Sequence, residues 1–267
     1  MDLLKRKLAP ITPEAWEQID NEASRVLKLH LAARKVVDFS GPHGWKLGGV
    51  NTGRLKPIHK GPLPEVQHAV RDVQPLIEIR APFVIKILEL DYAARGADDL
   101  DLDPVIAAAE RIALAEDMAA FGGFKDARIG GIIESSPHAP IDVKASLDWP
   151  RAVVQAKDVL RAAGMNGPYA LVLGPQAYAE LTADSEDGYP LRQRIEANVD
   201  GPLVWAPALV SGALLLTTRG GDYELTVGQD MSIGYAFHDR ENVELYLTES
   251  FTFRVLEDKA AILLKRS

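Results

Sequence analysis

The C-terminal part of the chain contains, from Arg219 to Val255, the stretch RGGDYELTVGQDMSIGYAFHDRENVELYLTESFTFRV. Two glycines within Arg219–Asp222 predict a hairpin turn, because glycine readily adopts positive φ, and Tyr223–Val227 would be the returning strand. Further along, apolar side chains occupy alternate positions at Val243, Leu245, Leu247, Phe251, Phe253 and Val255. This alternation predicts strands with one buried face. The C-terminal part is therefore expected to be rich in β-structure.

Helical patterns come earlier in the chain. Thr12 is suited to cap a helix, Pro13 fits its first position, and Glu14 favours the positive end of its dipole. Apolar residues then recur at three- and four-residue spacing, at Trp16, Ile19, Ala23, Val26, Leu27 and Leu31. Such a stripe needs a partner surface. The partner is either the protein's own core or a docking surface on another subunit or a peptide.

Two more long helices are predicted, an alanine-rich one from Asp103-Pro104 to Gly122-Gly123 and another from Trp149-Pro150 to Gly164. Shorter elements follow as strands or apolar runs at Tyr169–Leu173, Leu203–Ala206, Leu209–Thr218 and Ala261–Leu264, and as helices at Gln176–Thr182 and Leu191–Ala197. Helices and strands mix without a strand–helix–strand rhythm. The predicted fold class is therefore α+β.

The segment between Asn51 and Pro82 is polar and extended, with little core pattern. A stretch of about 30 residues of this kind is long for a compact domain. It is either a disordered loop or an arm that folds against a neighbouring molecule. At its far end, Leu76–Arg80 and Phe83–Leu90 are predicted to be strands.

Composition excludes several classes of function. The 267 residues include 30 Lys and Arg against 38 Asp and Glu, a net charge of −8, which argues against a generally basic nucleic-acid binder. The absence of cysteine excludes disulfides, thiol catalysis and Cys-type metal centres. The first residues lack the apolar core of a signal peptide, and no apolar run is long enough for a membrane span. A cytoplasmic protein without a membrane partner is expected.

No catalytic constellation is present. None of the six histidines lies within a helical turn of another, and motifs for a serine nucleophile or a phosphate-binding loop are missing. Asp98, Asp99, Asp101 and Asp103 are interpreted as a solvated loop with a helix cap, since the spacing of a calcium loop is absent. We expect no metal site, no cofactor and no enzyme, but an interaction or assembly protein.

Further motifs occur in order along nearly the whole chain: LKRKLAPITPEAWEQIDNEA, ARKVVDFSGPHGW, PLIEIRAPF, LELDYAARG, GPYALVL and DGYPLRQRIE. Each is weak alone. RGGD followed by GQDxSIGY and LTExFTF at the observed spacing is specific. Together these segments resemble encapsulins, bacterial and archaeal shell proteins that share the major capsid fold of tailed phages.

The resemblance implies a peripheral domain with a long spine helix, an axial domain and an extended loop. The corresponding segments are residues 1–50 for the N-terminal helix and the start of the peripheral domain, 51–74 for the extended loop, 75–129 for the peripheral domain with the spine helix, 130–217 for the axial domain, and 218–267 for the C-terminal part of the peripheral domain and the strands that support the loop. It also implies that the loop pairs with the sheet edge of a neighbouring copy. The expected assembly is an icosahedral shell of sixty copies.

The function implied by the resemblance is to enclose a cargo enzyme that carries a C-terminal targeting peptide. The residues that match the family's peptide site are Leu27, Arg34, Asp38, Asp230, Ile233 and Tyr235. An apolar groove would hold small aliphatic anchors, with Arg34 and Asp38 available for charge-assisted hydrogen bonds. Alternatively, Arg34 and Asp38 are only an i,i+4 ion pair at a helix end.

The resemblance also implies a pore at the five-fold axis, lined by Asp184, Ser185, Glu186, Asp187, Gly188 and Tyr189. Five copies of its carboxylates would attract cations such as ferrous iron. A ferritin-like protein or a dye-decolourising peroxidase is then the expected cargo, for iron storage or defence against oxidative stress. Some encapsulins bind flavin against a tryptophan, but Leu88 occupies that position, so flavin binding is not expected.

Two other functions compete with this one. The chain is alternatively a prophage major capsid protein without enzyme cargo, which the retained residues of the peptide site disfavour. A third hypothesis is that the chain is an enzyme, and the missing catalytic constellation argues against it.

Overall fold

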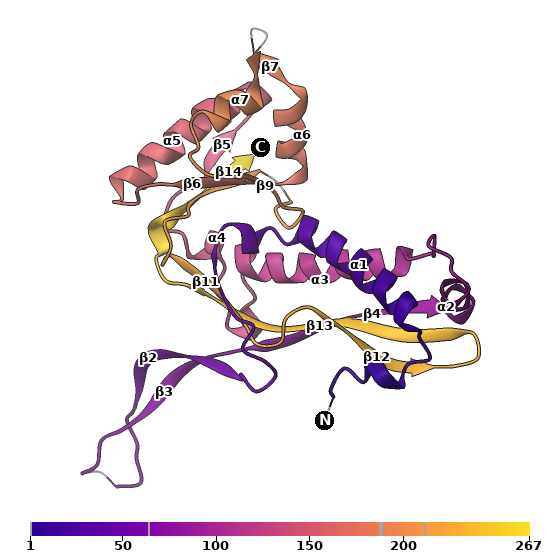
Figure 1. Cartoon of the computed structure of the whole chain (residues 1–267). Helices are drawn as coiled ribbons and strands as arrows, with labels where there is room; N and C mark the ends of the chain where they lie inside the picture. Colours follow the sequence, from indigo (N-terminus) through magenta and orange to yellow (C-terminus); the bar gives the residue numbers. More distant parts are fainter. Residues whose placement is uncertain (1, 64, 187–188, 211) are drawn as a thin grey trace.

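Two five-stranded sheets organise the described part of the chain, which comprises residues 2–63, 65–186, 189–210 and 212–267 of the computed structural model (Figure 1). The first sheet contains β1 (Asp38–Ser40), β11 (Tyr223–Val227), β13 (Asn242–Val255), β12 (Ser232–His238) and β4 (Ile77–Lys86). The second has the order β5 (Ile141–Val143), β14 (Ala261–Arg266), β10 (Ala213–Thr217), β6 (Tyr169–Leu173) and β9 (Leu203–Trp205). The mixture of helices with two separate sheets confirms the α+β class.

Strand β13 is the centre of the first sheet. It pairs antiparallel with β4 along one edge, and with β12 and then β11 along the other. Val243, Leu245, Leu247, Phe251 and Phe253 are buried as predicted, but Val255 is only partly buried. Every residue from 245 to 253 is buried, so the single buried face that the alternation predicted is wrong for this part of the strand. The 14 residues of β13 therefore connect every other strand of this sheet except β1, which joins through β11.

The hairpin predicted at Arg219–Asp222 is wrong. The turn does have two glycines with positive φ, but β10 before it belongs to the second sheet and β11 after it to the first. Asp222 is buried and accepts hydrogen bonds from Arg219 and from the Thr217 hydroxyl. These bonds fix a crossing between sheets, a geometry that the glycine signal does not distinguish from a hairpin.

Helices α1 (Pro13–His30) and α3 (Asp103–Gly122) lie side by side against the first sheet (Figure 1). Thr12 caps α1 by accepting from the backbone N–H of Ala15. The apolar stripe of α1 faces the core that α3, β4 and β13 share. Both helices confirm their predictions, and the α1 stripe is confirmed as core packing.

Helix α2 (Ile87–Ala94) corrects the strand predicted at Phe83–Leu90. Strand β4 is continuous through Pro82, which an edge strand tolerates, and it ends at Lys86. The residues that follow form a helix whose buried positions, Leu90 and Ala93, are three apart. The run Phe83–Leu90 is apolar at its start, so its hydrophobic period does not distinguish a strand from a helix.

The second sheet and its helices form the upper part of Figure 1. Strands β6 and β10 are buried along their whole length. The surrounding helices are α5 (Trp149–Ala162), α6 (Pro175–Ala183) and α7 (Leu191–Glu196), and the short helix α4 (Ile132–Ser135) lies between β14 and α3. The predicted domain boundary at residue 218 stays a prediction; β14 lies beyond it in sequence yet pairs with β10 and β5 of the second sheet.

The extended segment forms a hairpin that projects from the rest of the molecule (Figure 1). Strands β2 (Gly49–Ile58) and β3 (His68–Pro75) pair with each other, so a disordered loop is the wrong interpretation. Among the described residues neither strand has another partner strand. Its apolar side chains, among them Leu55, Ile58, Val70 and Val73, are exposed.

The remaining elements are short. The 3-10 helices are η1 (Arg6–Leu8), η2 (Ala33–Lys35), η3 (Lys125–Ala127), η4 (Ser146–Asp148) and η5 (Asp258–Ala260), and the small pair β7 (Ser185–Glu186) and β8 (Tyr189–Pro190) lies at the tip of the upper part. None of the helices in the described ranges is long and apolar enough to cross a membrane.

Candidate functional site

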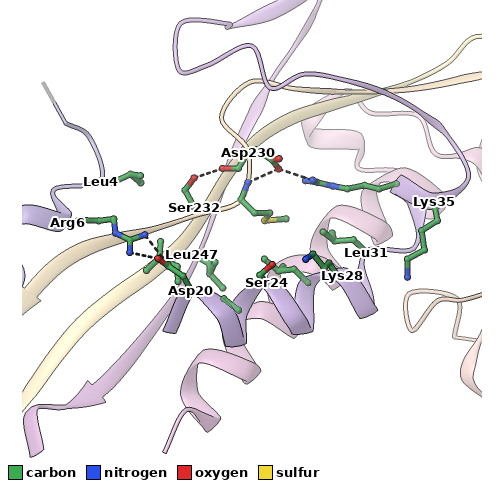
Figure 2. A pocket seen from close by; sticks show the side chains of 15 residues that line it. Leu4, Arg6, Asp20, Ser24, Lys28, Leu31, Lys35, Asp230, Ser232 and Leu247 are labelled. Carbon is green, nitrogen blue, oxygen red and sulfur yellow. Dashed lines mark hydrogen bonds and ion pairs between the residues drawn. The ribbon is translucent and has the colours of Figure 1, made fainter. Parts of the chain in front are cut away.

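A groove of about 570 Å³ lies between α1, the N-terminal segment and the loop that precedes β12 (Figure 2). Its lining comprises Leu4, Arg6, Asp20, Ala23, Ser24, Leu27, Lys28, Leu31, Arg34, Lys35, Asp230, Met231, Ser232, Ile233 and Leu247. The α1 residues among them recur at three- and four-residue spacing, so they share one face of the helix. The groove therefore uses part of the face that packs α1 onto the core.

Apolar side chains form the middle of the groove. Ala23, Leu27 and Leu31 follow one another by single helical turns, while Ile233 and Leu247 come from neighbouring positions on β12 and β13. All five are buried. A concave apolar surface of this size, with polar groups at its ends, is suited to small aliphatic side chains of an extended peptide.

Ion pairs close the two ends of the groove. Arg6 makes two hydrogen bonds to Asp20 and stacks over Trp16, with its guanidinium carbon 3.8 Å from the ring centroid. At the other end, Asp230 accepts from Arg34 at 2.8 Å. Figure 2 shows both pairs, and it also shows Asp230 bonded to Ser232 within the same loop.

Arg34 binds two further carboxylates beneath the groove. Its Nε and Nη2 donate to Glu116 at 2.7–3.0 Å, and its Nη2 also donates to Glu249 at 2.5 Å. The Glu116 and Glu249 side chains are 0% exposed. One cation therefore joins η2, α3, β13 and the Asp230 loop in a buried cluster.

Burial dominates the electrostatics of this cluster. It raises the pKa of Glu249 well above the ordinary value, and nearby Glu116 raises it further while Arg34 opposes the rise. Burial also raises the pKa of Asp117 to about 7, although this carboxylate accepts from two backbone N–H groups at the start of η2. Burial shifts both acids towards their neutral forms because the protein interior solvates charge poorly.

The structure brings four of the six predicted peptide-site residues together: Leu27, Arg34, Asp230 and Ile233 line the groove. Asp38 lies outside it, on β1, and accepts from the backbone N–H of Gly221. Helix α1 ends at His30, and Arg34 binds Glu116, Asp230 and Glu249 rather than forming a helix-end pair with Asp38.

Tyr235 also lies outside the groove lining. Its hydroxyl lies 2.6 Å from His238 Nδ1, and its backbone N–H donates to the Leu4 carbonyl. It therefore holds the N-terminal segment that forms one wall of the groove.

Several lining residues were missed in the sequence. Asp20, Ser24 and Lys28 share the helical face of Leu27, so their spacing would have found them. The positions of Leu4, Met231 and Leu247 depend on contacts between segments more than 200 residues apart, which no local pattern reveals.

Four of the six predicted pore residues lie at the tip of the upper part of the molecule. Asp184 follows α6 and is half-buried, Ser185 and Glu186 form β7, and Tyr189 begins β8. Asp187 and Gly188 lie outside the described residues. Their arrangement around an axis depends on other copies, so the pore stays a prediction.

No group of three or more possible ligands for a metal ion occurs within the described ranges. In the acidic loop before α3, Asp101 accepts from the backbone N–H of Asp103. The N-cap residue of α3 is Leu102, which makes no side-chain cap bond, so the predicted acidic cap is wrong. Leu88 is exposed on α2.

The fold is that of a capsid protein. A virus-like particle from Pyrococcus furiosus matches with a TM-score of 0.66 and 14% identity, covering 94% of this chain and 100% of that one. The capsid of Myoviridae phage XM1 matches with a TM-score of 0.56 and 12% identity, covering 88% and 91%. The tailed-phage capsid fold is thus confirmed at identities that establish architecture alone.

Sequence similarity then defines the family. The family model described as "Encapsulating protein for peroxidase" (Linocin_M18) matches residues 1–252. Type 1 encapsulin shell proteins of Rhodospirillum rubrum and Mycobacterium tuberculosis are 50% and 41% identical, each covering 99% of this chain, and 97% and 99% of their own length. The chain belongs to the encapsulin shell protein family.

Proposed function

We propose that the chain assembles into a closed icosahedral shell of sixty copies and encloses an enzyme. Closed symmetry lets many weak contacts between identical subunits add up to a stable particle. The projecting hairpin supports this proposal, because its outer strand edges have no partner strand in the described part of the chain and its apolar side chains are exposed, which suits pairing with a neighbouring copy. The role is structural rather than catalytic, inside the cytoplasm, without nucleic acid or membrane.

The groove beside α1 is the proposed docking site for a targeting peptide at the C-terminus of the cargo. The observation that carries this proposal is the apolar centre of the groove between two polar ends. Leu27 and Ile233 would contact aliphatic side chains of the peptide. Arg34 would act through Asp230, since its own donors are directed to carboxylates.

The test fills the groove without removing core contacts. Ser24→Trp places a large side chain in the groove from a half-buried position. Arg25→Trp is the control, because Arg25 is exposed on the same helix and is not part of the lining. A native-host strain carrying each variant would be lysed, and the purified shells analysed by mass spectrometry. We expect shells from both variants, with co-purified cargo missing only from Ser24→Trp.

Equal amounts of co-purified cargo in the two variants would contradict the groove as the docking site. Empty shells from the unmodified chain as well would favour the alternative function, a prophage capsid protein without enzyme cargo. The identity of the co-purified enzyme decides between a ferritin-like protein and a peroxidase, and so between iron storage and defence against oxidative stress. The family description, "Encapsulating protein for peroxidase", supports a peroxidase.

Entry of small substrates is proposed to occur at the tip that contains Asp184 and the short strands β7 and β8. Asp184 and Glu186 are acidic and lie at the end of the upper part of the molecule (Figure 1). Several copies around an axis would produce a negative potential that raises the local concentration of cations.

A further inference from the structure

The cluster beneath the groove contains more negative than positive groups. Three carboxylates, those of Glu116, Asp230 and Glu249, bind the single guanidinium of Arg34. Two of them are completely buried. If all three were ionised, an uncompensated negative charge would remain in a poorly solvated site, which is a costly state.

The hydrogen bonds show which acid is suited to hold a proton. Glu116 accepts from Arg34 with both of its carboxylate oxygens. Glu249 accepts from Arg34 with Oε1, whereas its Oε2 is buried and has no hydrogen-bond partner in the described part of the chain. A proton on Oε2 removes the excess charge and gives this oxygen a hydrogen to donate towards Glu116. The raised pKa of Glu249 agrees with this assignment.

The other charged groups around Glu249 do not replace the proton. On β4, Glu78 and Arg80 flank the residue paired with Glu249 and bind each other on an exposed surface. On α3, Asp117 adds another carboxyl group and uses it to accept from the backbone of η2. On η2, Lys35 donates to a backbone carbonyl of α1.

The cluster reaches the groove through Asp230. Its Oδ1 accepts from Arg34 and from the backbone N–H of Met231, both at 2.8 Å. Its backbone carbonyl accepts from the Ser232 hydroxyl and from the Gln229 side chain. The Gln229–Ser232 loop, which forms one wall of the groove, is thus attached to the buried acids by Arg34 alone among the ion pairs of the described ranges.

We propose that Glu249 holds a proton against Glu116, and that this pair, acting through Arg34 as a positioning residue, keeps the Gln229–Ser232 loop in place, so that the groove loosens when the proton is lost. A peptide in the groove would then be held less tightly at high pH. This last consequence rests on the proposed function, whereas the proton and the loop do not.

Infrared spectroscopy of purified shells near neutral pH tests the proton directly. A buried protonated carboxylic acid absorbs apart from ionised carboxylates. We expect this absorption in the unmodified shell and a weaker one in Glu249→Gln, which imitates the protonated side chain. Asp117→Asn shows how much of this absorption comes from Asp117. Glu244→Gln is the matched control, since Glu244 is exposed on the same strand. An unchanged absorption in Glu249→Gln would overturn the proposal.

The pH dependence of stability supplies a second test. A carboxyl whose pKa is raised in the folded state loses stability as pH rises from its ordinary value, 4.5, towards the raised one. Glu249→Gln has no such loss. Its melting temperature should equal that of the unmodified shell near pH 4.5 and exceed it increasingly as the pH rises above that value. A lower melting temperature for Glu249→Gln at every pH would mean that ionised Glu249 is needed, and would overturn the proposal.

Hydrogen exchange reports on the loop. Protection of the backbone amides at residues 229–232 should fall with rising pH in the unmodified shell, after correction for the intrinsic rate, and stay constant in Glu249→Gln. Equal pH dependence in both would overturn the coupling between the acids and the groove. These measurements use empty shells, so a failure of cargo docking leaves their outcome unaffected.

Discussion

The two five-stranded sheets bury different chemistry at their centres. In the second sheet, β6 and β10 are buried throughout, and their side chains are apolar apart from the hydroxyls of Tyr169 and Thr217. In the first sheet, the central strand β13 buries Thr248, Glu249, Ser250 and Thr252. An apolar centre needs only close packing, whereas a polar centre needs a partner for each charge. The polar centre is the one that adjoins the groove.

The largest expected effect comes from removing the cation at the polar centre. Arg34→Met leaves Glu116 and Asp230 without their counter-charge, and should lower the free energy of unfolding by about 3–5 kcal/mol. Chemical denaturation of the subunit measures this change. In a background of Glu116→Gln and Glu249→Gln, Arg34→Met should lower the free energy of unfolding clearly less, because fewer buried carboxylates then lose their counter-charge. Equal costs in the two backgrounds would contradict an electrostatic origin.

A cavity at the apolar centre should have a slightly smaller effect. Leu215 is 0% exposed in β10, so Leu215→Ala should lower the free energy of unfolding by about 2–5 kcal/mol, without pH dependence. Val154→Ala, at an exposed position of α5, serves as the control and should change it by about 0.5 kcal/mol or less. A strong dependence of the Leu215→Ala effect on pH would break the distinction between the two sheets.

The β2–β3 hairpin belongs to neither five-stranded sheet. Leu55→Asp combined with Val70→Asp should change the stability of the subunit by about 0.5 kcal/mol or less, because both side chains are exposed. It should nevertheless prevent shell assembly, as measured by light scattering. Leu55→Ile with Val70→Ile keeps the surface apolar and should assemble normally. Normal shells from the aspartate variant would remove the hairpin from the interface.

The smallest effect is expected at the tip of the upper part. Asp184→Asn with Glu186→Gln should slow the entry of ferrous iron into loaded shells by a factor of a few at low salt, and by less at high salt, because ions screen the attraction. Glu241→Gln, a charge change at an exposed position next to β13, is the control. An equal rate for all three shells at low salt would contradict a cation-attracting entrance.

Local patterns predicted many of the elements correctly. Thr12 and Pro13 mark the start of α1, the two glycines after Phe121 mark the end of α3, and the alternation around Leu245 marks β13. Each of these signals acts within a few residues, so it survives in the folded chain. The errors arose where one pattern fits two structures, as for the apolar run that becomes α2 and for the glycine turn that crosses between sheets.

The candidate site was predictable only in part. Leu27 belongs to the apolar stripe that periodicity predicted, whereas Ile233 was indicated only by the resemblance to the family. The partners of Arg34 were not predictable, because Glu116, Asp230 and Glu249 lie between 82 and 215 residues away along the chain. Asp38 is the acidic residue close to Arg34 in the sequence, and it is therefore the more obvious partner. Sequence distance gives no reason to prefer the remote acids.

Many of the elements and the family follow from the sequence, because hydrophobic period, helix caps and motif spacing are local properties of the chain. The tertiary structure alone decided which strands share a sheet, how the hairpin projects, and which charges are buried together. Burial is the physical reason for this division. The ionisation of Glu249 and the bonds of Arg34 depend on how little water reaches them, and that is fixed only when η2, α3 and β13 pack against one another.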